Sequence, residues 1–182
     1  MSVFTNPASR SAEQARAYTT AILDLLGTRE PIDVLKGTAD GIRTAIAGLS
    51  ETQLSQPETP GKWSMRHVVQ HLADSDLVWG YRVRLVLAQD RPPLTGYDQD
   101  LWSNRLHYES APVDEGLERF AVLRRSNLRL LANASPADLQ RVGVHAERGE
   151  ESVGLMIRLY AGHDLLHLQQ LARIRRTVAP QA

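Results

Sequence analysis

Apolar residues recur at intervals of three and four along most of the chain, the spacing that places them on one face of an α-helix. Strict alternation of apolar and polar residues, which is typical of a half-buried strand, is almost absent. Pro31 suits a first helical turn, Ser64 an N-cap and Gly27 a helix end. The pattern predicts long helices over residues 11–26, 31–49, 64–89, 112–133 and 151–176, with shorter turns over 98–102 and 135–138.

The segments between these helices predict how the bundle is connected. Residues 55–62 hold two prolines and a glycine and are expected to form a loop. The connection from Asp90 to Pro112 is long enough to cross the molecule, so a plain up-and-down hairpin stack is not expected. We therefore predict an all-α fold, a four-helix bundle with a long crossover and an extra N-terminal helix. One domain is expected over residues 1–182, with its core at about 18–176.

Composition narrows the classes of function. The 182 residues are 42% hydrophobic, enough for a proper core, and include no cysteine, so a metal site must use His, Asp or Glu. The net charge is zero with no basic stripe, which argues against a nucleic-acid partner. Residues 1–10 are polar, unlike a signal peptide, and no apolar run reaches the roughly 20 residues that span a bilayer. We expect a cytoplasmic protein with no membrane partner.

The strongest chemical signal is the pair His163 and His167. Residues four apart share one helix face with their side chains about 5–6 Å apart, so one metal ion can bind both imidazoles. A third ligand must come from elsewhere, and His71 lies on a helix stripe with polar groups along its centre. His67 precedes His71 by four residues and keeps the choice of third ligand open. Alternatively, these are core histidines that each make one hydrogen bond.

For other polar residues the sequence gives weaker evidence of a functional role. Asp164 follows His163 as a general base would, but it faces about 100° away on the helix, so a supporting or surface role is equally expected. Arg82 lies three turns after His71 and could hold an anionic substrate or form a salt bridge inside the bundle. His107 and His145 fall in predicted loops and are expected to be surface residues.

Together, three stretches of the chain resemble a known family. Residues 60–75 include Pro-Gly-Lys-Trp-Ser and Gln-His-Leu-Ala-Asp-Ser, residues 92–98 read Pro-Pro-Leu-Thr-Gly-Tyr-Asp, and residues 161–168 read Ala-Gly-His-Asp-Leu-Leu-His-Leu. In order and spacing they resemble the DinB-like superfamily, most closely its YfiT-type branch of metal-dependent hydrolases, from about residue 18 to 176. The resemblance implies a four-helix bundle that binds zinc or nickel through His71, His163 and His167, with water in the remaining coordination positions. It also implies a homodimer.

The resemblance implies more than one function. Related proteins include S-transferases that use bacillithiol, mycothiol or glutathione, so the leading expectation is a metal-dependent thiol S-transferase in detoxification or stress response. Arg82 or Asp98 would then orient the thiol or its electrophilic partner. The alternative is a hydrolase in which the metal activates water and Asp98 or Asp164 manages the proton. A third possibility is a stress protein that binds metal or a small ligand without turnover. Cationic pocket walls would favour the transferase, and a carboxylate beside the metal would favour the hydrolase.

Overall fold

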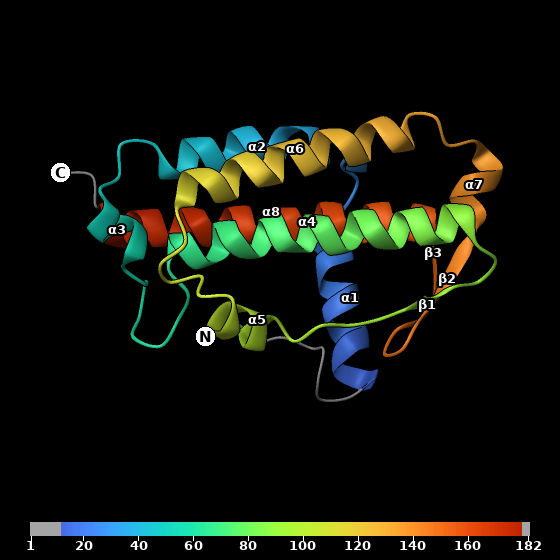
Figure 1. The fold of residues 1–182 in the computed structure, drawn as a ribbon, viewed down its shortest axis with the longest axis horizontal. Helices are drawn as coiled ribbons and strands as arrows, with labels where there is room; N and C mark the ends of the chain where they lie inside the picture. Colours follow the sequence, from blue (N-terminus) through green and yellow to red (C-terminus); the bar gives the residue numbers. More distant parts are fainter. Residues whose placement is uncertain (1–11, 180–182) are drawn as a thin grey trace.

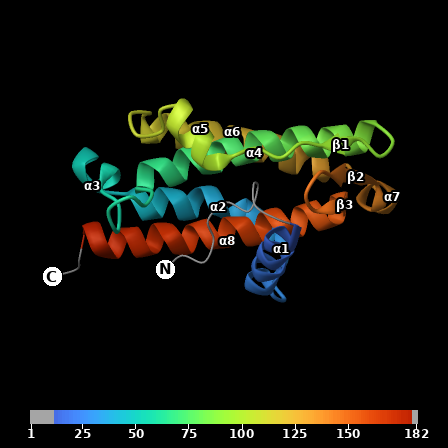
Figure 2. The same cartoon turned by 90° about the horizontal axis from the view of Figure 1, so that it is seen from below.

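The computed structural model describes residues 12–179 and forms a four-helix bundle crossed by one further helix (Figure 1). The bundle helices are α2 (Pro31–Ile46), α4 (Met65–Ala88), α6 (Val113–Leu131) and α8 (Val153–Val178). Helix α2 packs on α8 and α4 packs on α6, and these two layers face each other (Figure 2). The predicted all-α bundle and its boundaries are confirmed to within a few residues. The first predicted helix appears as α1 (Ala12–Leu26), but Ser11 and the polar residues 1–10 lie outside the described part of the chain.

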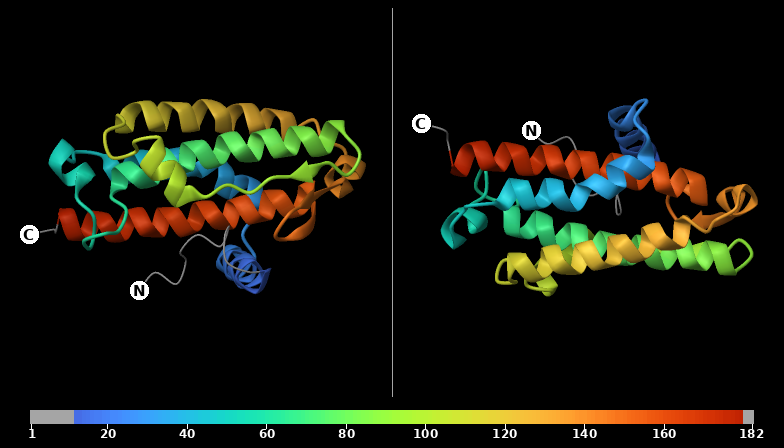
Figure 3. Two further views of the ribbon diagram at one scale, coloured as in Figure 1. Left: turned by 60° about the horizontal axis from the view of Figure 1, so that its bottom comes forward. Right: turned by 90° about the horizontal axis from the view of Figure 1, so that it is seen from above.

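The predicted crossover sets the direction of the bundle helices. After α4 ends, the chain returns along the molecule through β1 (Pro93–Leu94) and α5 (Gln99–Arg105) before α6 begins (Figure 1). Helices α4 and α6 therefore run in the same direction although they are neighbours. In the left view of Figure 3 the returning segment runs alongside α4 and α8. It therefore covers the face of the bundle to which the histidines belong.

A small sheet at one end of the bundle was not expected from the sequence. Strands β2 (Val142–His145) and β3 (Gly149–Ser152) pair antiparallel, and β1 pairs parallel with β2 so that Leu94 lies opposite His145. The short helix α7 (Pro136–Gln140) precedes β2 and has the predicted cap at Ser135. Because residues 149–152 form a strand, α8 begins at Val153 rather than at the predicted Glu151. Ser152 caps α8 by accepting a hydrogen bond from the backbone N–H of Leu155.

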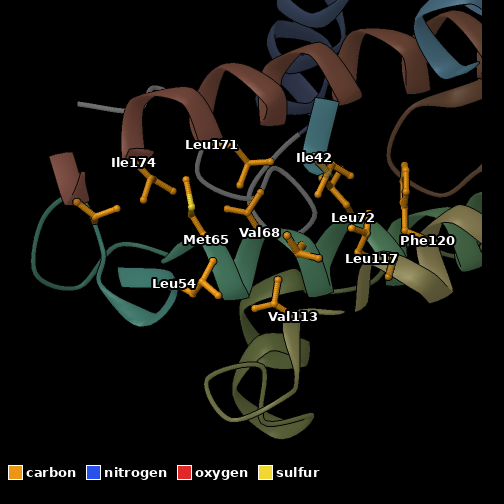
Figure 4. Packing of buried hydrophobic residues seen from close by; sticks show 13 residues of the cluster. Ile42, Leu54, Met65, Val68, Leu72, Val113, Leu117, Phe120, Leu171 and Ile174 are labelled. Carbon is orange, nitrogen blue, oxygen red and sulfur yellow. The ribbon is translucent and has the colours of Figure 1, made fainter. Parts of the chain in front are cut away.

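The core consists of two apolar clusters separated by buried polar groups. One cluster joins the N-terminal part of α4 to α6, α8 and the short helix α3 (Glu51–Ser55), and includes Met65, Phe120 and Leu171 (Figure 4). The other surrounds Trp79 and Met156 near the sheet. Ser64 stands at the predicted N-cap of α4, but its hydroxyl contacts His67 Nδ1 at 2.8 Å instead of capping the backbone.

Helix α1 approaches α8 more closely than side chains usually allow. A Cβ atom at Gly162 would lie 2.2 Å from the carbonyl oxygen of Ile22, so the contact requires glycine at this position. Gly162 directly precedes His163, and α1 therefore covers the flank of the histidine pair. Among the described residues, no helix is both long and apolar enough to cross a membrane.

Candidate metal centre

The structure brings the three predicted ligands, His71, His163 and His167, together between two packed helices. His71 comes from α4, and the other two lie one turn apart on α8. One ring nitrogen from each residue lies within 4.8 Å of the other two. His67, the competing third ligand, does not belong to this group. Their placement agrees with the predicted ligand set, and metal binding itself stays a prediction.

One pair of ring nitrogens has the spacing that a shared ion requires. His71 Nε2 lies 3.2 Å from His163 Nε2. Two nitrogens bound tetrahedrally to one zinc ion lie about 3.4 Å apart, given Zn–N bonds of about 2.1 Å. The His167 Nδ1 atom lies 2.8 Å from Gln170 Oε1, which can only accept, so Nδ1 carries the proton and Nε2 keeps a free lone pair. The donor set therefore fits a divalent transition metal.

Burial keeps two of these imidazoles neutral. Burial, reinforced by the neighbouring histidines, lowers the pKa of His71 well below its ordinary value. The pKa of His167 falls to about 3, chiefly because of burial and then because of His163. Neutral rings have the lone pair that a metal ligand needs, so these residues are ready to bind an ion at neutral pH.

Asp164 lies on the other side of α8 from the histidines. Its carboxylate pairs with Arg124 and accepts a hydrogen bond from Thr38 Oγ1 at 2.7 Å. Burial, the largest single influence, would raise the pKa of Asp164, but the interactions with Arg124 and His163 together outweigh it and hold the pKa at about 2. The nearest approach to a ring is 3.9 Å, from Asp164 Oδ1 to His163 Nδ1, which is too long for a hydrogen bond. The structure thus favours the supporting role over the catalytic one.

Asp98 also lies outside the immediate surroundings of the triad. Its carboxylate caps α5 by accepting hydrogen bonds from the backbone N–H groups of Asp100 and Leu101, at 3.0 and 2.9 Å. It lines neither of the two cavities that adjoin the histidines. The catalytic role suggested for Asp98 gains no support from this position.

Two cavities flank the histidine triad. The first, of about 100 Å³, is bounded by α1, the crossover, the sheet and the helices α4 and α8, and His71 and His163 form part of its wall. The second, of about 480 Å³, lies toward the N-terminus of α4 and includes His67 and His167. Gln99, at the start of α5, lines both. Each of the two cavities is thus lined by at least one histidine of the triad.

Ionisable side chains line one end of the first cavity. Arg82 lines it together with His145 and Arg148, as does the carboxylate residue Glu147. Arg82 thus shares a cavity with two triad histidines, as its predicted role requires, although that role stays a prediction. The expectation that His145 is a surface residue is wrong: it lies in β2 and is only 2% exposed. His107, the other histidine predicted to lie at the surface, is exposed as expected.

Hydroxyl groups connect the triad to the crossover. Ser75, one turn after His71 on α4, lies 3.3 Å from His71 Nε2 and 2.7 Å from the Tyr97 hydroxyl. Burial raises the pKa of Tyr97, so its hydroxyl stays protonated and can donate. The sequence analysis did not identify Ser75, Tyr97 or Gln170 as site residues. The available signal was spacing, since Ser75 follows His71 by four residues and Gln170 follows His167 by three.

Together, the fold and the triad define a helical-bundle protein with a candidate metal centre of three histidines. The DinB superfamily model matches residues 35–171, about three quarters of the chain. This chain belongs to the DinB superfamily.

Individual relatives agree with this assignment. A protein of Bacillus mycoides, named a candidate metal-dependent hydrolase, is 30% identical over 144 residues, which cover 79% of this chain and 83% of the relative. A protein of Geobacillus thermodenitrificans with the same designation is 27% identical over 175 residues, covering 95% and 90% of the two chains. The structure of YfiT from Bacillus subtilis, described as a probable metal-dependent hydrolase with an unusual four-helix bundle topology, superimposes with a TM-score of 0.76. It has 24% sequence identity and covers 95% of this chain and 92% of its own. The YfiT-type fold predicted from the sequence is thereby confirmed.

Proposed function

We propose that this protein is a metal-dependent thiol S-transferase that holds one zinc or nickel ion on His71, His163 and His167. The observation that carries the proposal is the pair of cavities on either side of the triad. A transfer reaction needs a thiol and an electrophile to meet at one centre, and two cavities that each adjoin the triad would suit that arrangement. Arg82, which lines the first cavity and forms no ion pair, suits a thiol that carries an acidic group.

The chain supplies three ligands and leaves room for a reactant. A three-histidine set with further positions free is typical of catalytic rather than structural zinc. When bound, such an ion lowers the pKa of a thiol or water that coordinates it, so that a nucleophile forms near neutral pH. Gln170 would fix the orientation of the His167 ring through their 2.8 Å hydrogen bond. Ser75 and Tyr97 would offer hydroxyl groups to a reactant in the first cavity.

Hydrolysis is the second candidate, and one observation favours it. Glu147 lines the first cavity, where a carboxylate could accept a proton from an attacking water. A Cβ atom on Gly96 would lie 3.1 Å from Glu147 Oε1, so this carboxylate lies against the crossover. Glu147 therefore replaces Asp98 and Asp164 as the candidate general base for this reaction. The designation of the relatives as candidate hydrolases agrees with it.

One kinetic comparison separates these functions. Zinc- or nickel-reconstituted protein without a polyhistidine tag would be assayed with monochlorobimane and, in turn, bacillithiol, mycothiol and glutathione. The proposal predicts saturable conjugation with at least one thiol, lost in His163→Ala. Parallel assays would use p-nitrophenyl esters and no thiol. Ester turnover that requires Glu147, without conjugation, would replace the transferase by the hydrolase. Metal binding with neither reaction would leave a binding protein and contradict both.

A further inference from the structure

Arg82 is a buried cation without an anionic partner. Its side chain is 5% exposed, and its guanidinium donates to the backbone carbonyl of Thr95. The Nε–H group has no acceptor, and no carboxylate within the described part of the chain forms an ion pair with it. Burial of an unpaired charge costs several kcal/mol. The cavity therefore contains a charge that a bound anion would compensate.

Two other arginines, the buried Arg124 of the core and the partly buried Arg148 of the cavity wall, show what Arg82 lacks. Arg124 pairs with two carboxylates, and Arg148 pairs with Glu151, which is itself 2% exposed. The charge of Arg148 at the cavity wall is thus already balanced within the protein. Of the two arginines that line the cavity, Arg82 is the one that forms no ion pair with a carboxylate.

His145 supplies a second donor without a partner. Its Nδ1 atom accepts a hydrogen bond from the backbone N–H of Glu147 at 3.2 Å. In a neutral ring the proton must then be on Nε2, and this buried N–H finds no acceptor in the described structure. Burial, followed by the charges of Arg148 and Arg82, lowers the pKa of His145 to about 4, so the ring is neutral at pH 7.

The fold brings these two donors to the same short stretch of the crossover. Arg82 holds the carbonyl of Thr95, and the pairing of β1 with β2 places His145 opposite Leu94. A Cβ atom on Gly96 would lie only 3.7 Å from His145 Cε1. Both residues line the cavity that His71 and His163 also line. A ligand in this cavity can therefore meet both donors at one end and the triad at the other.

We propose that Arg82 and His145 form a binding site for an anionic oxygen group, such as a carboxylate or phosphate, of a small substrate whose other end reaches the histidine triad. Two N–H donors that line one cavity, one of them on an arginine that forms no ion pair, match two oxygen atoms that share a negative charge. A water molecule could accept from the N–H groups but would leave the charge of Arg82 unbalanced. The inference deepens the proposed function by defining the substrate class, and the binding itself requires no metal.

The test uses succinate and inorganic phosphate as anionic probes and succinamide as the neutral counterpart of succinate. Binding to the metal-loaded full-length chain would be measured by calorimetry, together with Arg82→Met and the control Arg158→Met, an exposed arginine on α8. We expect saturable binding of at least one anion and none of succinamide. Affinity should fall at least about tenfold in Arg82→Met and stay unchanged in the control. Equal affinity in the wild type and Arg82→Met, or no saturable binding, would overturn the inference.

A second arm separates this site from the metal. In His163→Ala the anion should still bind, because Arg82 and His145 are intact. If anion binding disappears with the triad, the probe was bound to the metal and the inference is wrong. Activity with neutral and acidic thiols at the same kcat/KM would also contradict the anion site while leaving the proposed transferase intact. Conversely, anion binding without any turnover would contradict the proposed function alone.

A spectroscopic readout keeps the inference testable if Arg82→Met does not fold. Nitrogen-15 NMR of the wild type should show His145 as the Nε2-protonated tautomer, with Nδ1 unprotonated. Its Nε2–H resonance and the Nε–H resonance of Arg82 should both shift as succinate is added. Unchanged resonances at a saturating probe concentration would contradict the assignment.

Discussion

Helices α4 and α8 bury polar side chains on two different faces. On one face these side chains pair with one another, and on the other face several of their polar atoms have no partner. On one face Arg124 pairs with Asp76 and Asp164, with Nε–Oδ1 of 2.8 Å to Asp76 and Nη2–Oδ1 of 3.3 Å to Asp164. Thr38 and Asn127 donate further hydrogen bonds to these carboxylates, at 2.7 and 3.0 Å. This paired network lies between the two apolar clusters of the core.

On the other face, buried polar atoms lack partners. Five buried side-chain atoms of the described residues have no hydrogen bond, and four belong to residues of the first cavity: His71, Arg82, His145 and His163. The fifth, Trp79 Nε1, belongs to a ring stacked on the cavity residue Tyr160 at 4.8 Å. Native proteins satisfy nearly all buried polar groups, so this concentration is unusual. A ligand in the cavity could supply partners to Arg82 and His145, whereas the atoms without partners on His71 and His163 are Nδ1 and not the Nε2 atoms that would share the metal. We infer that the paired network around Arg124 stabilises the fold and that the polar groups without partners belong to the functional site.

The comparison is tested most strongly by removing the central cation of the paired network. Arg124→Met should lower the free energy of unfolding by about 3–5 kcal/mol, because it leaves the buried Asp76 and Asp164 without their counterion. Urea unfolding at pH 7 measures this loss. Arg158→Met, at an exposed arginine, is the control and should change stability by less than about 0.5 kcal/mol. A loss for Arg124→Met no larger than that of the control would mean that the network does not stabilise the fold.

A smaller effect is expected from the group that orients a candidate ligand. Gln170→Ala removes the acceptor of His167 Nδ1–H and should weaken metal affinity about 10- to 100-fold. Competition with a chromophoric chelator measures the change. Gln169→Ala, at the exposed neighbouring glutamine, should leave the affinity unaltered. Equal affinities in the two variants would show that Gln170 has no part in the metal centre.

Replacing an arginine by methionine on the unpaired face should have little effect on the stability of the protein. In protein free of anions, Arg82→Met loses the hydrogen bond to Thr95 but also removes an uncompensated buried charge. We therefore expect its free energy of unfolding to differ from that of the wild type by less than about 1.5 kcal/mol. A loss as large as that of Arg124→Met, measured in the same urea experiment, would show that Arg82 has a structural role instead.

The last predicted effect concerns the dependence of stability on pH. The pKa of His145 is about 4 in the folded protein, against about 6.5 when unfolded. Between these values the unfolded chain binds more protons, so this residue makes stability fall as the pH is lowered from about 6.5 to 4. His145→Asn should reduce that dependence in metal-free protein, and His107→Asn, at an exposed histidine, should not. The same pH dependence in both variants would contradict the neutral state of His145.

The helices and the histidine pair were predictable because both depend on local spacing. Apolar periodicity defined the bundle helices, and the i,i+4 relation placed His163 and His167 on one face. Choosing His71 over His67 needed the family resemblance, since the two residues lie on the same helix and spacing alone did not separate them. The orientation of Asp164 away from its neighbour followed from the 100° turn per residue, as the structure shows.

The sheet, and the place of Arg82 and His145 in the cavity wall, could not be predicted. Strands β2 and β3 are four residues each, too short for a clear alternating pattern, and β2 pairs with Pro93–Leu94 about fifty residues earlier. His145 becomes buried only through this long-range pairing. Its lack of an acceptor, like that of Arg82, depends on tertiary packing that no local sequence pattern contains.

The central claim is that the three histidines hold one metal ion, and metal content tests it most directly. Protein purified without a polyhistidine tag would be analysed by elemental mass spectrometry beside His163→Ala, with folding of both checked by circular dichroism. The account predicts about one zinc or nickel ion per wild-type chain and almost none in the variant. Wild-type protein that is metal-free and takes up neither ion when it is added would contradict the account.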